Sequence, residues 1–140
     1  MTTSRAAAVA AHSDQKATAI DENHLDRMTL GDRRLEREVL DLFLRQTTLM
    51  LDRIMAAEAP VAAAAAHTLK GSARGIGAWR VARAAETLER AAGQNVRDTG
   101  IADDRDDLEA AIAELRAASL EAGAAIATRL TVLLAERGGR

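Results

Sequence analysis

The sequence predicts an all-α protein, an antiparallel up-down-up-down four-helix bundle with a short extra helix at its N-terminal end. About a quarter of the 140 residues are alanine, the strongest helix former. Strand-favouring residues are scarce, since the chain has one phenylalanine, one tryptophan and no tyrosine. Four long segments place apolar residues at helical spacing and are joined mostly by short connections. The length suits a single domain.

Charge and composition exclude several classes of function. The chain carries 19 basic and 21 acidic residues, so it has neither the basic surface of a nucleic-acid binder nor an acidic tail. It has no cysteine, which excludes disulfides and thiol chemistry. The apolar run after Arg5 is too short for a signal peptide, and no run is expected to reach membrane-spanning length. We therefore expect a cytoplasmic protein that binds neither nucleic acid nor membrane.

The N-terminal end of the chain has a different character from the rest. Residues 1–20 are rich in alanine, serine, threonine and charge and show no sustained periodicity. They are expected to be a mobile tail or an added segment, followed by a bundle of residues 21–137. The first helix should be short, from Leu25 to about Gly31.

Capping residues set the predicted bounds of the next two helices. Asp32 can cap a long helix that runs to about Ala59. Pro60 favours the first turn of the next helix, where its missing N–H costs nothing, and that helix should extend to about Ile76. Gly77 then supplies the turn.

The spacing of apolar residues predicts the last two helices. The fourth, residues 78–92, has a predicted core stripe of Val81, Ala85, Leu88 and Ala92. Residues 93–103 contain two glycines and should form a loop, and the acidic run 103–107 suits the start of a final helix, because the macrodipole favours negative charge there. That helix should end at Gly138 and Gly139. Its predicted core seam is Leu108, Ile112, Leu115, Ser119, Ala122, Ile126, Arg129 and Leu133.

The third helix carries the candidate functional residues. Its apolar positions form one stripe, with spacings of four, three, four and three: Ala62, Ala66, Leu69, Ala73 and Ile76. At about 100° per residue, His67 lies roughly 150° from the centre of this stripe and Gly71 almost opposite it, so both should face solvent. The neighbours of His67 on that face are Ala63, Ala64, Lys70, Gly71 and Arg74.

An exposed imidazole among small residues and two cations is suited to carry a phosphoryl group. The ring is a nucleophile near neutral pH, and Lys70 could offset the added negative charge. A mid-helix glycine costs about 1 kcal/mol relative to alanine, and access to the His67 ring is a reason to keep Gly71. From spacing alone, a plain solvated histidine and a glycine that serves helix packing stay open as alternatives.

The stretch AAHTLKGSARGIGAWRVARAAETLE resembles the signature of histidine phosphotransfer (Hpt) domains. In that signature a histidine, then Leu-Lys-Gly-Ser-Ala, then Gly-Ala, then a late Leu-Glu recur at set offsets. The matching residues are His67, Leu69, Lys70, Gly71, Ser72, Ala73, Gly77, Ala78, Leu88 and Glu89. Upstream, MTLGDRRLEREVLDLFL resembles the family's entry into its long second helix, so the resemblance covers about residues 25–134. Trp79 departs from the family pattern, because family members have variable and often smaller side chains at this position. This departure bears on the choice of partner.

The resemblance implies a bundle whose His67 accepts a phosphoryl group from a receiver aspartate and passes it to another. It also implies that Lys70 helps to hold that group and that Gly71 keeps the ring accessible. The implied partners of this carrier, expected to be monomeric, are response-regulator receiver domains and a hybrid histidine kinase. No cofactor is expected on this chain, since the required Mg²⁺ belongs to the receiver. The sequence has no glycine-rich nucleotide loop, so independent catalysis from ATP is not expected.

The second helix is apolar on most of its circumference and could present a docking surface. One sector comprises Leu35, Val39, Leu42, Phe43, Leu49 and Met50, and another, about 120° away, comprises Leu40, Leu44, Leu51, Ile54 and Met55. Either both sectors are buried, or the second is partly exposed beside the third helix, where Leu40 and Leu44 would dock a receiver helix. Trp79 should be partly exposed or lie over the bundle end near Gly77, and it joins Ala64 and Arg74 as a candidate partner contact.

Other functions stay open at this point. A helical adaptor that binds a receiver or kinase without accepting phosphate would keep the bundle but would not need His67. A fragment of a chemotaxis-type kinase is less favoured, because the chain ends soon after the bundle. No metal site is expected, because His12 and His24 lack partners at ligand spacing and the acidic run 103–107 lacks the glycine of an EF-hand loop.

Overall fold

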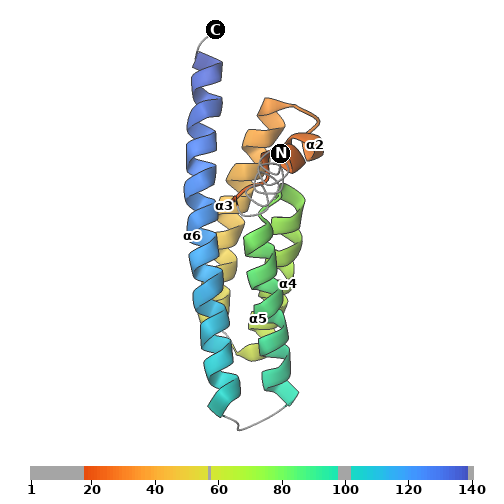
Figure 1. Cartoon of the computed structure of the whole chain (residues 1–140), viewed down its shortest axis with the longest axis vertical. Coiled ribbons are helices and arrows are strands. Elements are labelled where there is room, and N and C mark those ends of the chain that lie inside the picture. Colours follow the sequence, from red (N-terminus) through yellow and green to blue (C-terminus); the bar gives the residue numbers. More distant parts are fainter. Residues whose placement is uncertain (1–17, 57, 98–101, 139–140) are drawn as a thin grey trace, which may run out of the picture.

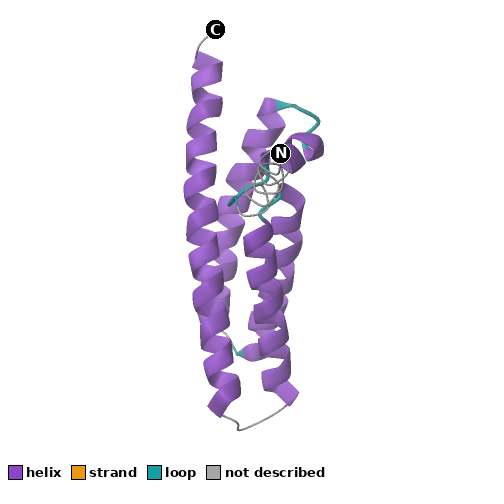
Figure 2. Ribbon diagram, viewed as in Figure 1, coloured by secondary structure: helices purple, strands orange, loops and turns teal. Residues whose placement is uncertain are grey.

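The computed structural model describes residues 18–56, 58–97 and 102–138, which form helices and turns with no strand (Figures 1 and 2). The helices are α2 (Glu22–Met28), α3 (Arg33–Ala56), α4 (Ala59–Ile76), α5 (Trp79–Arg97) and α6 (Ala102–Gly138). The prediction of an all-helical protein with a short helix before four long ones is confirmed for the described residues. Residues 1–17 of the expected tail lie outside the described part, and Ile20, at the end of that tail, is buried in the core.

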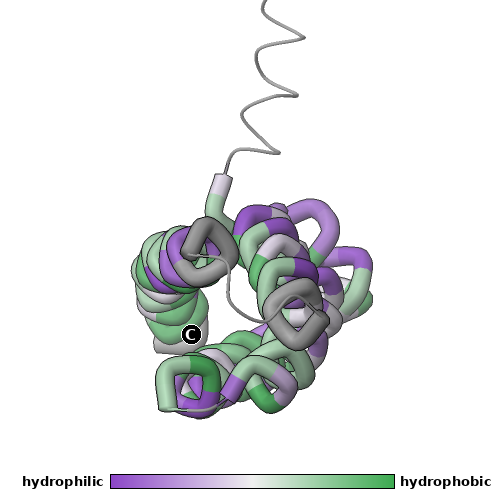
Figure 3. The backbone as a smooth tube through the Cα atoms, turned by 90° about the horizontal axis from the view of Figure 1, so that it is seen from below, coloured by the Kyte–Doolittle hydropathy of each residue, from purple (hydrophilic) through white to green (hydrophobic). Residues whose placement is uncertain are grey.

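The four long helices pack around one hydrophobic core. α3 and α5 each contact both α4 and α6, so the helices surround a common centre, as Figure 3 shows end-on. α2 packs against α4 at the end of the bundle where α4 turns into α5. Large side chains from every helix fill the centre, and the largest fully buried apolar ones are Leu25, Leu40, Leu69, Val81, Leu88, Leu115 and Ile126.

The predicted N-terminal signals of α3 and α4 and the predicted end of α4 are confirmed, whereas α3 ends at Ala56, before the expected Ala59. The Asp32 carboxylate accepts hydrogen bonds from the backbone N–H groups of Arg34 and Leu35, which caps α3. Pro60 lies in the first turn of α4, and Gly77 ends that helix with a left-handed φ of 81°.

Other predicted boundaries also differ from the structure, and the first helix ends at Met28 instead of near Gly31. The first helix begins at Glu22, before the expected Leu25, because the Asp21 side chain caps it by accepting from the His24 N–H. The expected loop at 93–103 is wrong for most of its length, since α5 continues to Arg97 and α6 begins at Ala102. A single glycine such as Gly93 costs a helix only about 1 kcal/mol, which the continuing helical hydrogen bonds can offset. The acidic run does lie in the first turns of α6, as expected.

The predicted core faces of α4, α5 and α6 are confirmed. Every member of the α4 and α5 stripes is buried. On α6 the seam is buried at Leu115, Ser119, Ala122, Ile126 and Leu133 and partly buried at Leu108, Ile112 and Arg129.

The expectation for the second helix is wrong, because α3 buries the arc between the two predicted sectors. The buried apolar residues are Leu40, Phe43, Met50 and Ile54, drawn from both sectors. Leu40 has no exposed surface, so it cannot belong to a docking surface. Leu44 is half-buried and lies toward Gly123 of α6, away from α4. The exposed leucines of α3 are Leu35, Leu42 and Leu49 of the first sector.

Helix α6 is apolar on two faces, one of which is exposed. Beside the core seam, a second set with spacings of four and three is exposed: Ala113, Ala117, Leu120, Ala124, Ala127, Thr131 and Leu134. Within the stretch Asp106–Glu136, an 18-residue segment has a mean hydropathy of 1.3, so this part of the helix could cross a membrane by length and composition alone. The expectation that no run reaches this length is therefore wrong, because alanine keeps the hydropathy high around a helix that also packs in the bundle.

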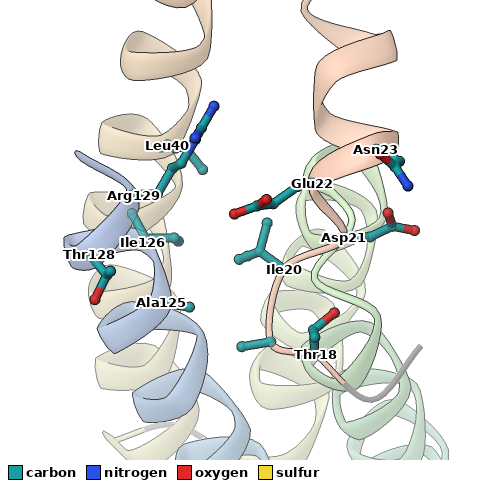
Figure 4. A pocket seen from close by; sticks show the side chains of 11 residues that line it. Thr18, Ile20, Asp21, Glu22, Asn23, Leu40, Ala125, Ile126, Thr128 and Arg129 are labelled. Atoms are coloured by element: carbon teal, nitrogen blue, oxygen red, sulfur yellow. The ribbon is translucent and has the colours of Figure 1, made fainter. Parts of the chain in front are cut away.

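A buried ion pair joins α3 to α6. The Glu36 side chain is 2% exposed and accepts from Arg129 Nε at 2.6 Å and from Arg33 Nη1 at 2.9 Å. The hydrogen bond from Arg129 to Glu36 is the main reason that the pKa of Arg129 is raised. Beside the pair lies a cavity of about 530 Å³, where Ile20 and Glu22 face Ile126 and Arg129 (Figure 4).

We predict that Gly77→Ala destabilises the protein by about 1–2 kcal/mol. The residue has a φ of 81°, and an added Cβ would lie 3.0 Å from both the Cβ and the carbonyl oxygen of Asp21. Gly93→Ala is the control, since a Cβ there meets nothing within 4 Å, and it should stabilise by up to about 1 kcal/mol. Urea unfolding followed by circular dichroism measures both, and equal stability of the two variants would contradict the constraint at Gly77.

Candidate functional site

His67 lies on the solvent face of α4, opposite the buried stripe of that helix. Its side chain is 67% exposed, so the predicted orientation is confirmed. Ala64, one turn away, is also exposed and leaves the approach to the ring clear of large side chains. The ring is therefore accessible to a partner protein.

Glu89 of α5 bridges His67 and Lys70. Its Oε2 lies 2.7 Å from His67 Nδ1, and its Oε1 accepts from Lys70 Nζ at 2.6 Å. An ionised carboxylate only accepts hydrogen bonds, so Nδ1 must carry the proton in this arrangement. In the neutral ring, Nε2 then has a free lone pair and is the nucleophilic nitrogen.

The charges around Glu89 keep its carboxylate ionised. The hydrogen bond from Lys70 is the largest cause that lowers the pKa of Glu89, and the hydrogen bond from His67 lowers it further. Burial of the carboxyl group raises the pKa of Glu89, but this effect is smaller than the lowering by its partners. The acceptor that holds the His67 proton in place is therefore present at neutral pH.

The two cations predicted beside His67 both have acidic partners on α5. Lys70 lies on the face that was expected to be exposed, but its side chain is only 14% exposed and its Nζ bonds to Glu89 of α5. Arg74 is more exposed and lies 3.8 Å from Glu86. The face around His67 thus holds two ion pairs rather than two free cations.

Gly71 has open space around it. It lies exposed on the same face as His67, and an added Cβ would meet nothing within 4 Å. Its φ is outside the left-handed range, unlike that of Gly77. Close helix packing and backbone strain are therefore excluded as reasons for this glycine.

An apolar groove runs along the α3 side of α4, on the flank of that helix away from Glu89. Its volume is about 270 Å³, and its lining residues are Leu25, Met28, Thr29, Leu35, Val39, Leu42, Phe43, Gln46, Ser72, Gly75 and Ile76. The Ser72 hydroxyl donates to Gln46 Oε1 at 2.7 Å, which ties α4 to α3 beside the groove. We call this feature the α2–α3–α4 groove.

Trp79 is half-buried at the end of the bundle near Gly77, as the sequence predicts, and it contacts α2. Its Nε1 donates to Asp21 Oδ2 at 3.0 Å, and its ring lies 4.8 Å from the ring of His24. The sequence places Trp79 near the turn but gives no sign of these partners, which are more than fifty residues away along the chain.

Glu89 is the site residue to which the sequence alone assigns no role. It matches the Hpt signature and directly follows Leu88 of the core stripe, which places it at the edge of the buried face of α5. Its partners depend on how α5 is aligned along α4, and that alignment follows from tertiary packing. In the described part of the chain, no group of three acidic, histidine or cysteine side chains could hold a metal ion.

We predict that Lys70→Ala raises the pKa of Glu89 toward the ordinary glutamate value, because the Lys70 hydrogen bond is the largest cause of its lowering. In the folded protein the pKa of Glu89 is below its unfolded-state value. The ionised Glu89 therefore stabilises the fold above the unfolded-state pKa, and this stabilisation is lost as the pH falls through the folded-state pKa. Carboxyl carbon NMR measures the titration. Arg80→Ala is the control on the same helix, and an unchanged Glu89 pKa in Lys70→Ala would contradict the assigned cause.

Comparison with known proteins gives one match. The family model of the Hpt domain matches residues 38–122, more than half of the chain, and this span includes His67, Lys70, Gly71 and Glu89. Searches of curated proteins and of solved structures found no match. Hpt domains are phosphocarriers that act through histidine phosphotransfer in two-component phosphorelays, with receiver domains and kinases as partners. By this match and its helical bundle, the chain belongs to the Hpt domain family.

Proposed function

We propose that this protein relays a phosphoryl group between the aspartates of two receiver domains through His67. The observation that carries the proposal is the hydrogen bond between Glu89 and His67 Nδ1, with the ring otherwise exposed. It leaves Nε2 as the nitrogen that meets a partner. In this proposal the chain acts as a carrier without catalysis of its own.

In the proposed transfer, the lone pair of His67 Nε2 attacks the phosphorus of a receiver's aspartyl phosphate in line. The Nε2–P bond forms, the P–O bond to the aspartate breaks, and the aspartate carboxylate leaves with the electron pair. The phosphorylated ring keeps its Nδ1 proton and becomes cationic, and the Glu89 carboxylate stabilises that charge. Lys70 binds the same carboxylate that holds the His67 ring, and its charge is proposed to offset that of the phosphoryl group. The reverse reaction delivers the group to a second receiver.

We propose that Mg²⁺ for this reaction is held by the receiver and that this chain binds no cofactor. The donor set supports this division, because the acidic side chain at the site, Glu89, is already bonded to His67 and Lys70. The chain's own contribution is then to hold the ring, fix its tautomer and leave space for the partner.

The proposed docking surface is the α2–α3–α4 groove together with the exposed face of α4. Leu42 and Leu49 are about half exposed, and Leu35 is 37% exposed. An apolar patch of this kind beside a reactive residue suits the apolar face of a receiver helix. Ala64 and Arg74 lie on the same side as His67 and are proposed to contact the receiver's loops. Leu40 and Leu44 have no part in this surface.

The proposed domain is an up-down-up-down antiparallel bundle of residues 21–137. The turns at the two ends of α4 lie at opposite ends of the bundle in Figure 1, which supports this order. We propose that the protein works in the cytoplasm as a monomer, without nucleic acid or membrane, and receives phosphoryl groups from a hybrid kinase. An adaptor that never accepts phosphate is the competing function.

We predict that His67→Gln folds normally and accepts no phosphoryl group, because the side chain is exposed and its ring nitrogen is the acceptor. Incubation with a receiver carrying radiolabelled aspartyl phosphate measures acceptance, and an acid-labile, alkali-stable label identifies phosphohistidine. His24→Gln is the control and should reach the same final extent of labelling as the parent at a saturating receiver concentration. Labelling retained in His67→Gln would contradict the assignment, and absence of label in the parent with every cognate receiver would favour the adaptor.

We predict that Gly71→Leu keeps its stability but slows transfer by at least about tenfold. Space around Gly71 allows the side chain to be accommodated within the fold, while a branched group one turn from His67 obstructs the approach of the aspartyl phosphate. Gly71→Ala is the matched control, and should be neutral or stabilise by up to about 1 kcal/mol. Thermal melting and label transfer measure the two effects; a Gly71→Leu variant with the parent transfer rate would show that access is not the reason for the glycine.

We predict that Leu42→Asp raises the KM for a phosphorylated receiver about tenfold, equivalent to about 1.4 kcal/mol, because it places a charge in the apolar groove. Leu120→Asp on α6 is the control, since Leu120 is 75% exposed and remote from the groove. Initial rates of transfer over a range of receiver concentrations measure KM. Equal KM values in the two variants would move the docking surface elsewhere.

A further inference from the structure

We infer that Trp79 is a positioning residue for partner recognition, because it fixes α2 as one wall of the α2–α3–α4 groove. The inference rests on the proposed function and adds to it a determinant that lies outside the reacting centre. It concerns how firmly a receiver is held and not the chemistry at His67.

A set of contacts, which we call the α2 clasp, fastens the start of α2 to the turn between α4 and α5. The Asp21 N–H donates to the Gly77 carbonyl at 2.9 Å, and the Asp21 carboxylate accepts from Trp79 Nε1 at 3.0 Å. His24 Nε2 lies 3.0 Å from the carbonyl oxygen of Arg74, in the last turn of α4. The ring of His24 also contacts that of Trp79. The clasp therefore consists of Asp21, His24, Arg74, Gly77 and Trp79.

The clasp is needed because α2 cannot hold its own position. The helix has seven residues, fewer than an isolated helix needs to be stable in water. Leu25 is its buried apolar anchor in the core, whereas Met28, in its last turn, is largely exposed. The direction of α2 relative to α4 thus depends on the polar contacts at its first turn.

The side of α2 that the clasp directs toward α3 and α4 forms part of the groove. Leu25, Met28 and Thr29 line it from α2, across from Leu35 and Leu42 of α3. If α2 moves, the groove loses one wall. The His67–Glu89–Lys70 contacts involve only α4 and α5, so the same movement leaves the reacting residues in place.

The test separates receiver binding from phosphoryl acceptance. Asp21→Ala removes the acceptor of the Trp79 N–H and the cap of α2, and Trp79→Phe keeps an aromatic ring but removes the N–H. For both variants we expect the KM for a cognate phosphorylated receiver to rise at least fivefold and kcat to stay within twofold of the parent. Labelling of His67 by phosphoramidate, which needs no docking, should also stay within twofold. Asp21→Asn keeps an acceptor oxygen and should restore most of the parent KM.

Arg80→Ala is the matched control. Arg80 follows Trp79 in the chain, but its guanidinium donates to Glu121 of α6 at 2.6 Å. The KM of the Arg80→Ala variant for the phosphorylated receiver should equal that of the parent. If Asp21→Ala shows no cooperative melting transition, Trp79→Phe decides the test.

The outcomes distinguish this inference from the proposed function. The role of the clasp is overturned if the folded clasp variants have the same KM as the parent, or if they lose kcat without a change in KM. In both cases phosphoramidate still labels His67, so the proposed function stands. If neither phosphoramidate nor any phosphorylated receiver labels the parent, the proposed function is overturned, and the inference with it. A raised KM with normal labelling, absent in Arg80→Ala, supports the clasp.

Discussion

Close packing of α4 against α5 is the constraint on which the candidate site depends. α4 and α5 pack against each other, and both helices are rich in buried alanine, including Ala62, Ala66 and Ala73 of α4 and Ala82 and Ala85 of α5. Side chains this small allow two helix backbones to approach closely. Carboxylates on α5 can then reach across to cations and an imidazole on α4, as Glu89 and Glu86 do. Larger residues in this interface would push α5 away and leave His67 without its acceptor.

Glu89 links the electrostatics of the site to the tautomer of the histidine. An exposed imidazole in water exchanges its proton between both nitrogens, whereas a carboxylate 2.7 Å from Nδ1 favours the proton on that atom. Lys70 in turn keeps Glu89 ionised. The His67 side chain is 67% exposed, and a contact at such an exposed position contributes little to stability, so the effect of its contact with Glu89 is mainly on the orientation of the ring. In the proposed transfer, the same carboxylate balances the positive charge of the phosphorylated ring.

Two glycines only six residues apart meet different physical requirements. Gly77 has a positive φ and the start of α2 packs directly on it, so both its backbone and its lack of a side chain serve the fold. Gly71 has ordinary helical geometry and open space, so nothing in the fold needs it. A glycine in mid-helix lowers helix propensity, and its proposed role at position 71 is to leave space for a partner that approaches His67.

The sequence by itself determined the helices, the faces they bury and the exposure of His67 and Gly71, because these depend on periodicity and capping within a few residues. The Asp32 cap, Pro60, Gly77 and the stripe of α4 are all local signals, and the structure agrees with them. The family signature also marks His67 as the candidate phosphoryl acceptor without reference to any contact. Only the tertiary structure decided which arc of α3 is buried, because a helix that is apolar on most sides is oriented by its neighbours; Leu40 is buried and Leu42 is exposed for that reason. The same holds for the contacts of Glu89 with His67 and of Trp79 with Asp21, which join residues 22 and 58 positions apart. Their distances follow from how the helices align along one another, and no local pattern in the chain specifies that alignment.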